Sequence, residues 1–138
     1  MDYSPNDADG RKQGFHDPVE RVQAYQLAVE AMRLGREDAR ALKADVLTRE
    51  VGGQLLRATA SIAANIAEGY SRASYADRRN FFEYALGSAR ESYVWYEAAD
   101  LPERDERIAR LTSIRRLLLT MIRTSRATAA ADRRRFAK

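Results

Sequence analysis

One apolar stretch of this chain, residues 61–69, is built mostly from small side chains and has the sequence SIAANIAEG. Its side chains are small or aliphatic except at Asn65 and Glu68, and a glycine closes it. The distance between two packed helices depends on the size of the side chains at their contact, so a helix this lean lets a neighbouring backbone come close. The segment therefore predicts a tight helix–helix contact.

Four segments show the three- and four-residue apolar spacing of amphipathic helices. The expected core positions are Val22, Tyr25, Val29 and Met32; Leu55, Thr59, Ile62 and Ile66; Phe82, Leu86, Ala89, Tyr93 and Tyr96; and Ile108, Leu111, Ile114, Leu118, Met121 and Ile122. No segment alternates apolar and polar residues over a strand's length, and most connections are short. The pattern predicts an all-α, antiparallel up-down-up-down four-helix bundle.

Local signals suggest where these helices begin and end. Asp17 followed by Pro18 predicts the start of a first helix over residues 18–34, with Gly35 as its stop. Residues 36–44 are then either a connection or a short helix. Gly69 is expected to end the second helix in a left-handed conformation, and Ser74 to cap the third.

The apolar pattern of the second helix begins at about residue 46 and becomes clear from residue 54. The Gly52–Gly53 pair, which is unfavourable inside a helix, therefore marks either a bend or the true start of this helix. The third helix should run to about residue 99. Pro102 is suited to opening the fourth helix, which is expected to fray after Ser125. We therefore expect a mobile arm over residues 1–16, a bundle over 17–126 and a basic tail over 127–138.

Composition limits the classes of function. A chain of 138 residues is typical of one domain, and no apolar run approaches the roughly 20 residues of a membrane span. The chain has no cysteine, which excludes disulfides and zinc–thiolate sites, and its first residues lack the apolar core of a signal peptide. These features predict a cytoplasmic protein.

Positive charge is concentrated at the C-terminal end. From residue 123 onward there are five arginines and one lysine against the single acid Asp132, whereas the whole chain carries a net charge of +4. Such a run is a common footprint of binding to nucleic-acid phosphates. It is equally the composition of a solubilising tail that complements a helix dipole, and the sequence leaves both interpretations open.

Enzymatic constellations are missing from the sequence. His16 is the only histidine and lies in the expected arm, so no serine has a histidine base and no glutamate a histidine co-ligand. Gly52–Gly53 is not followed by the Lys-Ser/Thr of a phosphate-binding loop. We expect no enzymatic activity, cofactor or metal; a site centred on Glu68 and Glu91 is the least favoured alternative.

Asn65 and Glu68 lie on or beside the apolar face of the second helix. A structural role is expected for both: Asn65 bonding across to Ser88 or Glu91, and Glu68 pairing with Arg72 or Arg90. Separately, the aromatic residues of the third helix are too many for one core face. They predict either a surface patch suited to a subunit interface or a wide core stripe; they are Tyr75, Tyr84, Tyr93, Trp95 and Tyr96.

Two segments carry a family resemblance. Residues 54–69, QLLRATASIAANIAEG, with Arg72 shortly after, and residues 81–91, FFEYALGSARE, resemble the four-helix-bundle proteins encoded in intervening sequences of bacterial 23S rRNA genes. The resemblance extends over about residues 22–122. The matching polar and glycine positions are Asn65, Glu68, Gly69, Arg72, Ser88 and Glu91.

The resemblance implies a ring-shaped homo-oligomer, typically a pentamer, with a basic surface suited to nucleic acid. The fold is also similar to that of the accessory variability proteins of diversity-generating retroelements, which bind RNA and a reverse transcriptase. This chain departs from the family in its longer arm and its arginine-rich end.

From these observations we expect a non-enzymatic, RNA-binding accessory protein that acts as a homo-oligomeric ring. The expected phosphate contacts are Arg115, Arg116, Arg123, Arg126, Arg133, Arg134 and Arg135. The alternative is a scaffold that docks a protein such as a reverse transcriptase, with the arginines serving only solubility.

Overall fold

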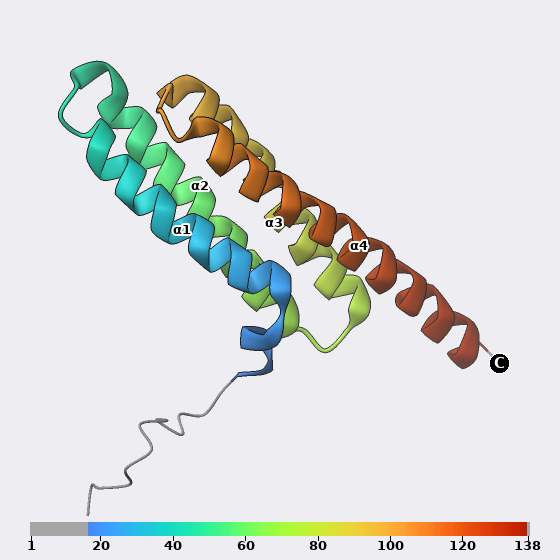
Figure 1. Cartoon of the computed structure of the whole chain (residues 1–138). Helices are drawn as coiled ribbons and strands as arrows, with labels where there is room; N and C mark the ends of the chain where they lie inside the picture. The colour runs from blue at the N-terminus through green and yellow to red at the C-terminus, as the bar shows by residue number, and fades with distance from the viewer. Residues whose placement is uncertain (1–16, 138) are drawn as a thin grey trace, which may run out of the picture.

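The computed structural model describes residues 17–137, and four long helices make up most of them (Figure 1). A short 3-10 helix, η1 (Pro18–Arg21), leads into α1 (Gln23–Leu42). The chain then forms α2 (Val46–Tyr70), α3 (Tyr75–Ala99) and α4 (Arg104–Phe136). The expected arm at residues 1–16 lies outside the described residues.

The helices alternate in direction, with α1 and α3 running one way and α2 and α4 the other (Figure 1). No strand occurs within residues 17–137. This confirms the predicted all-α bundle, in which each helix lies beside the one that follows it in sequence. The α1–α2 and α3–α4 turns are at one end of the bundle and the α2–α3 turn is at the other.

The first helix differs from the prediction at both ends. Asp17 does act as a cap, accepting a hydrogen bond from the Val19 amide (3.0 Å), but it caps the 3-10 turn and not the long helix. The predicted stop at Gly35 is wrong, because α1 continues to Leu42 and absorbs most of residues 36–44. Gly35 is buried against Thr59 of α2, so its missing side chain provides room and not a turn.

The second helix passes through Gly52 and Gly53 without a break and starts at Val46, where Asp45 caps it through the Leu47 amide (2.9 Å). The expectation that Gly69 ends α2 in a left-handed conformation is wrong, since no described glycine has a positive φ. A β-carbon at Gly69 would lie 2.7 Å from the ring of Phe82. Gly69 therefore lets the α3 ring pack against the α2 backbone.

The third helix follows the prediction closely. Ser74 caps it by accepting a hydrogen bond from the Asp77 amide (3.1 Å), and it ends at Ala99. The left-handed residue that closes α3 is Asp100, with φ of 51°, and Pro102 lies in the turn just before α4. Asp and Asn tolerate this region better than most residues, which is why no glycine is needed here.

The fourth helix does not fray after Ser125, contrary to the prediction. It continues to Phe136, and Ser125 and Ala129 are both buried. The alanines between residues 127 and 131 favour helix, so the arginines beyond them are carried on a continuous helix. Every residue from 131 to 137 is exposed.

The apolar pattern predicted the core of three helices well. Leu55, Thr59, Ile62 and Ile66 are all fully buried. On α4, Leu111, Ile114, Leu118 and Ile122 are buried, and on α3 all expected positions except Tyr93, which is 46% exposed. On α1 the buried face is instead the small one, Ala24, Ala28, Ala31 and Gly35, while Val22, Tyr25 and Val29 flank it.

A buried polar cluster joins three helices near the α3–α4 turn. Asp38 of α1 accepts hydrogen bonds from the Tyr96 hydroxyl of α3 (2.7 Å) and from Nε and Nη2 of Arg107 on α4 (2.8 and 3.1 Å). The three residues are between 2% and 8% exposed. A third guanidinium nitrogen of Arg107 donates to Glu106 (2.5 Å), so the charge is satisfied from two sides.

The contacts within the cluster move the pKa values of Tyr96 and Arg107 further from neutral pH. Burial, with the hydrogen bond to Asp38, raises the pKa of the Tyr96 hydroxyl far above its ordinary value. The hydrogen bond to Asp38 raises the pKa of Arg107 as well. Tyr96 therefore stays a neutral donor and Arg107 a cation, and the bidentate pair fixes α1 to α4 in one orientation.

We predict that Asp38→Asn destabilises the protein far more than Tyr96→Phe. The first change removes the buried carboxylate that neutralises Arg107 and leaves the half-exposed Glu106 as its one ion-pair partner among the described residues, which costs about 3–5 kcal/mol. The second removes one hydrogen bond and leaves the ion pair, which costs about 1 kcal/mol. Urea unfolding followed by circular dichroism measures both. Glu68→Gln, which breaks the exposed pair between Glu68 and Arg72, is the control. If Asp38→Asn lowered the free energy of unfolding by no more than Glu68→Gln does, the stabilising role of the cluster would be refuted.

A pair of glycine variants tests the close approach of α1 and α2. A β-carbon at Gly35 would lie 2.4 Å from Thr59 Oγ1, whereas one at Gly53 would have no neighbour within 4 Å. Alanine is favoured in a helix by about 1 kcal/mol at either site, but overpacking costs about 1–3 kcal/mol. We expect Gly53→Ala to raise the thermal midpoint and Gly35→Ala to lower it. A Gly35→Ala protein as stable as Gly53→Ala would contradict this packing.

Candidate nucleic-acid interface

The arginines of α4 fall into two groups along the helix. The first three are neutralised within the bundle: Arg104 pairs with Glu97 (3.0 Å), Arg107 with Asp38, and Arg110 with Glu106 (2.7 Å). The hydrogen bond from Arg110 also lowers the pKa of Glu106. This end of α4 therefore uses its charges to hold the structure together.

The later group coincides with the arginines predicted from sequence to contact phosphate. All seven are exposed, and within residues 17–137 only Arg126 has an ion-pair partner, Glu83 of α3 at 3.4 Å. The sole acid on α4 beyond Glu106 is Asp132. The far part of α4 thus presents positive charge that the described bundle leaves largely uncompensated; its arginines are Arg115, Arg116, Arg123, Arg126, Arg133, Arg134 and Arg135.

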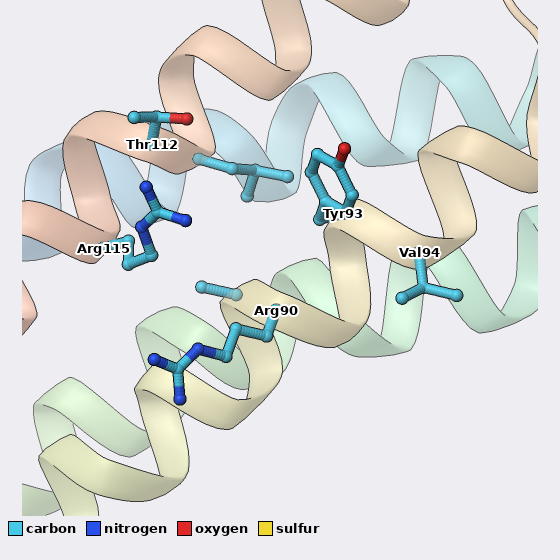
Figure 2. Close-up of a pocket in the computed structure, with 7 residues that line it drawn as sticks. Arg90, Tyr93, Val94, Thr112 and Arg115 are labelled. Carbon is cyan, nitrogen blue, oxygen red and sulfur yellow. The ribbon is translucent and has the colours of Figure 1, made fainter.

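Part of this charge lines a groove between α3 and α4. Its upper section, the one nearer the α3–α4 turn, has a volume of about 290 Å³. Arg90, Tyr93 and Val94 of α3 and Arg115 of α4 are among the residues that line it. Figure 2 shows Arg90 and Tyr93 projecting from α3, and Thr112 and Arg115 facing them from α4. Ala89 and Leu111 give the section an apolar floor.

The lower section of the groove is larger, at about 530 Å³. Arg123 and Arg126 line it from α4, and Glu83 and Arg90 from α3. Because Arg90 lines both sections, they are adjacent, and we call them together the α3–α4 groove. Four arginines and one glutamate give it a strongly positive wall.

The remaining predicted arginines do not line this groove. Arg116 is exposed on another side of α4, and Arg133, Arg134 and Arg135 lie on the last exposed turns. None of them forms an ion pair in the described part of the chain. The structure therefore places Arg115, Arg123 and Arg126 along the α3–α4 groove and leaves the other four as separate positive surface.

The residues of the predicted polar motif form hydrogen bonds with other partners than those predicted. Asn65 does not reach Ser88 or Glu91; its side-chain amide donates to the carbonyl and hydroxyl oxygens of Ser61 (2.9 and 3.0 Å). The Ser61 hydroxyl in turn bonds to that of Ser88 across the α2–α3 contact (2.9 Å). Ser61 is thus the link between the two helices, a role that the sequence pattern did not indicate.

The two glutamates of the motif serve local contacts at the surface. Glu68 pairs with Arg72, one of its two expected partners, but the pair is exposed and not buried, and Arg72 lies over the Phe81 ring at 4.6 Å. Glu91 accepts a hydrogen bond from the Trp95 indole (3.1 Å). These contacts support a structural role at the α2–α3 turn and along α3.

The aromatic residues of α3 divide as the surface-patch interpretation expects. Tyr96 is buried and Trp95 is half-buried, whereas Tyr84 and Tyr93 are 59% and 46% exposed. Val94 is also 57% exposed. The outer side of α3 therefore carries apolar surface that the described bundle does not cover.

Several important residues were not identified from sequence. Asp38 and Arg107 were missed because they are 69 residues apart and each is surrounded by other charges in the sequence. The sequence indicates Arg90 only as a partner of Glu68, yet it lines the α3–α4 groove. Its spacing of three residues from Tyr93 on one helical face was the available signal.

Within the described residues, no group of three or more histidine, cysteine, aspartate or glutamate side chains could hold a metal ion. His16 lies outside those residues. The helices that the structure describes also lack any segment long and apolar enough to cross a membrane.

Comparison with known proteins identifies the family. The sequence profile described as "23S rRNA-intervening sequence protein" matches residues 20–104, which is more than half of the chain. The chain belongs to the 23S rRNA-intervening sequence protein family. The match includes the last two residues of η1 and all of α1, α2 and α3, and it stops at the first residue of α4, so all seven unpaired or weakly paired arginines lie beyond it.

A solved structure supports the same fold. It is a crystal structure of a protein of unknown function from the S23 ribosomal protein family of Bacteroides thetaiotaomicron, 26% identical, with a TM-score of 0.67. The similarity covers 72% of this chain and 97% of that one. No curated protein matches the chain.

Proposed function

We propose that this member of the family is a cytoplasmic, non-enzymatic RNA-binding accessory protein that acts as a homo-oligomeric ring. The observation that carries the proposal is the split along α4. Its first three arginines are neutralised by carboxylates, and its last seven are exposed with one carboxylate partner among the described residues. Charge that merely stabilised the bundle would be paired, as it is near Arg104.

The α3–α4 groove has the chemistry of a backbone-binding channel. Guanidinium groups form bidentate hydrogen bonds with phosphate oxygens, and neither Arg115 nor Arg123 has an ion-pair partner within residues 17–137. Tyr93 borders the same groove and offers a ring on which a base can stack. A polyanion that follows the groove would release condensed counterions from each neutralised phosphate.

Family membership agrees with an RNA-related role at a coarse level, because the family is described by its link to 23S rRNA intervening sequences. A shared fold does not determine what is bound, so the specific assignment rests on the arginines of this chain. Those arginines lie outside the segment that matches the family profile.

The ring is supported by the outer side of α3. Tyr84, Gly87, Glu91 and Val94 recur on one helical face, which we call the outer α3 face, and all four are exposed. A β-carbon at Gly87 would meet nothing within 4 Å, so another backbone can approach there. Exposed apolar surface of this kind is typical of contacts between subunits.

The same face supports the alternative function. A partner protein such as a reverse transcriptase, rather than a second copy, would bury Tyr84 and Val94, and the arginines would then serve solubility. The alternative predicts that RNA affinity is weak and that removing arginines does not change it. RNA titrations and measurements of the oligomeric mass separate these possibilities.

We predict that Arg115→Gln/Arg123→Gln weakens binding of a labelled single-stranded RNA and flattens its salt dependence. Each phosphate that the variant no longer neutralises should reduce the slope of log K against log salt concentration by about 0.7. Fluorescence anisotropy titrations across a salt series measure both quantities. Arg21→Gln/Arg33→Gln removes the same charge from η1 and α1 and should leave the slope nearly unchanged.

Two further variants sharpen this test. Glu83→Gln removes the only carboxylate lining the α3–α4 groove and frees Arg126, so it should raise the affinity for RNA. Truncation after Thr128 removes Arg133, Arg134 and Arg135 and should lower both affinity and slope. The RNA assignment would fail if the double variant, the truncation and the intact chain gave the same titration.

We predict that Val94→Asp lowers the oligomeric mass, because a charge on the outer α3 face opposes burial in an interface. Sedimentation equilibrium should give a multiple of 15.6 kDa for the intact chain and a smaller mass for the variant. Val46→Asp is the matched control, since Val46 is 76% exposed at the start of α2 and does not belong to this face. A monomeric intact chain would overturn the ring and leave the RNA titration unaffected.

A further inference from the structure

A second positive groove lies between α1 and α2, near the turn that joins them. Arg36, Arg40 and Lys43 line it from α1 and its end, Arg49 lines it from α2, and its volume is about 370 Å³. No carboxylate is among its lining residues. We call it the α1–α2 groove, and it shares no residue with the α3–α4 groove.

The cations of this groove have no carboxylate partner among the described residues. Within residues 17–137 no ion pair involves Arg36, Arg40, Lys43 or Arg49, whereas Arg33, one turn earlier on α1, pairs with Glu30 (3.8 Å). Four like charges gathered on one side of a hairpin repel one another. An anion bound between them would relieve that repulsion.

Hydrogen bonds across the turn hold the shape of the groove without any ligand. Arg49 Nε donates to the carbonyl oxygen of Lys43 (3.2 Å), and the Thr48 hydroxyl donates to that of Leu42 (2.9 Å). These bonds tie the first turn of α2 to the last turn of α1. The site is therefore preorganised, which reduces the entropy that binding must cost.

The dimensions suit an extended strand. Arg36, Arg40 and Lys43 share one face of α1 and follow one another at about 4.5–6 Å along the helix axis. This is the scale of adjacent phosphates in a single strand. At Gly53 a β-carbon would meet nothing within 4 Å, so the wall of the groove is open at this point and has room for a small side chain.

We propose that the α1–α2 groove binds the phosphodiester backbone of a second single-stranded RNA segment. The two grooves lie between different pairs of helices, and they have no lining residue in common. One copy would thus hold two segments, or two stretches of one folded RNA, apart from each other. The choice of RNA as the ligand rests on the proposed function; the site itself rests on its own residues.

A membrane surface is a poorer occupant of this groove. The exposed apolar residues nearby, Val46 and Leu47, are at the tip of the hairpin, whereas Arg36 and Arg40 line its flank. A bilayer that received the tip would leave the flank in water. Anionic lipid vesicles are therefore included in the test as the competing ligand.

The test uses the absence of cysteine from the sequence. Gly53→Cys places a single thiol on the wall of the α1–α2 groove, Leu119→Cys places one in the α3–α4 groove, and Ala109→Cys places one on exposed α4 surface outside both. The rate of maleimide labelling is measured in the full chain with and without single-stranded RNA. At RNA about ten times above its dissociation constant, mass action should slow labelling of a covered thiol about tenfold.

The proposal expects protection at position 53 and none at position 109. Protection at 53 should persist when Arg115→Gln/Arg123→Gln is added and should be lost when Arg36→Gln/Arg40→Gln is added. The reverse dependence would show that position 53 is shielded only through the other groove, and the proposal would be wrong.

Two other outcomes overturn the proposal in distinguishable ways. Protection at position 119 alone would keep the proposed function and remove the second site. Protection at neither position would remove both. Slowed labelling at 53 with anionic vesicles but not with RNA would assign the groove to lipid phosphate instead.

Discussion

The bidentate pair between Asp38 and Arg107 fixes, together with the buried apolar side chains of α4, the rotation of this helix, on which the positive groove depends. Arg107 points inward to Asp38 and Tyr96, and at 100° per residue the face of α4 that includes Arg115 is turned about 80° from it. Arg116, one residue further, is turned about 180° and points away from the bundle. A different rotation would bury arginine or remove it from the groove. The charged surface thus depends on a polar contact that itself binds nothing.

The sequence was most informative where a structural feature depends on nearby residues alone. Ser74 was identifiable as a cap because its partner is the amide three residues on, and Ile62 and Ile66 because a helical face repeats locally. Gly35 and Gly69 were misread because glycine also ends helices. Their actual role is to make room for Thr59 and Phe82, and only the packed structure reveals such a neighbour.

The candidate site was predictable to a similar degree. The seven arginines could be picked out from sequence because they follow one another along the chain with almost no acid between them. Which of them are unpaired could not be predicted, since that depends on Glu83, an acid 43 residues from Arg126 on another helix. The α1–α2 groove was invisible for the same reason. From sequence, Arg36 and Arg40 belong to either a charged connection or a short separate helix, whereas α1 continues through them.

The unbroken course of α4 determines what size of molecule can engage all its exposed charges. Arg115 and Arg135 are separated by twenty residues of helix, a rise of about 30 Å. A compact anion such as a nucleotide can touch one or two of these arginines at a time, whereas an elongated polymer can satisfy the whole series. If this segment were a flexible, non-helical tail, its arginines could gather around a small ligand. A straight helix keeps the arginines apart, so the helical structure by itself favours a long anionic ligand over a small one.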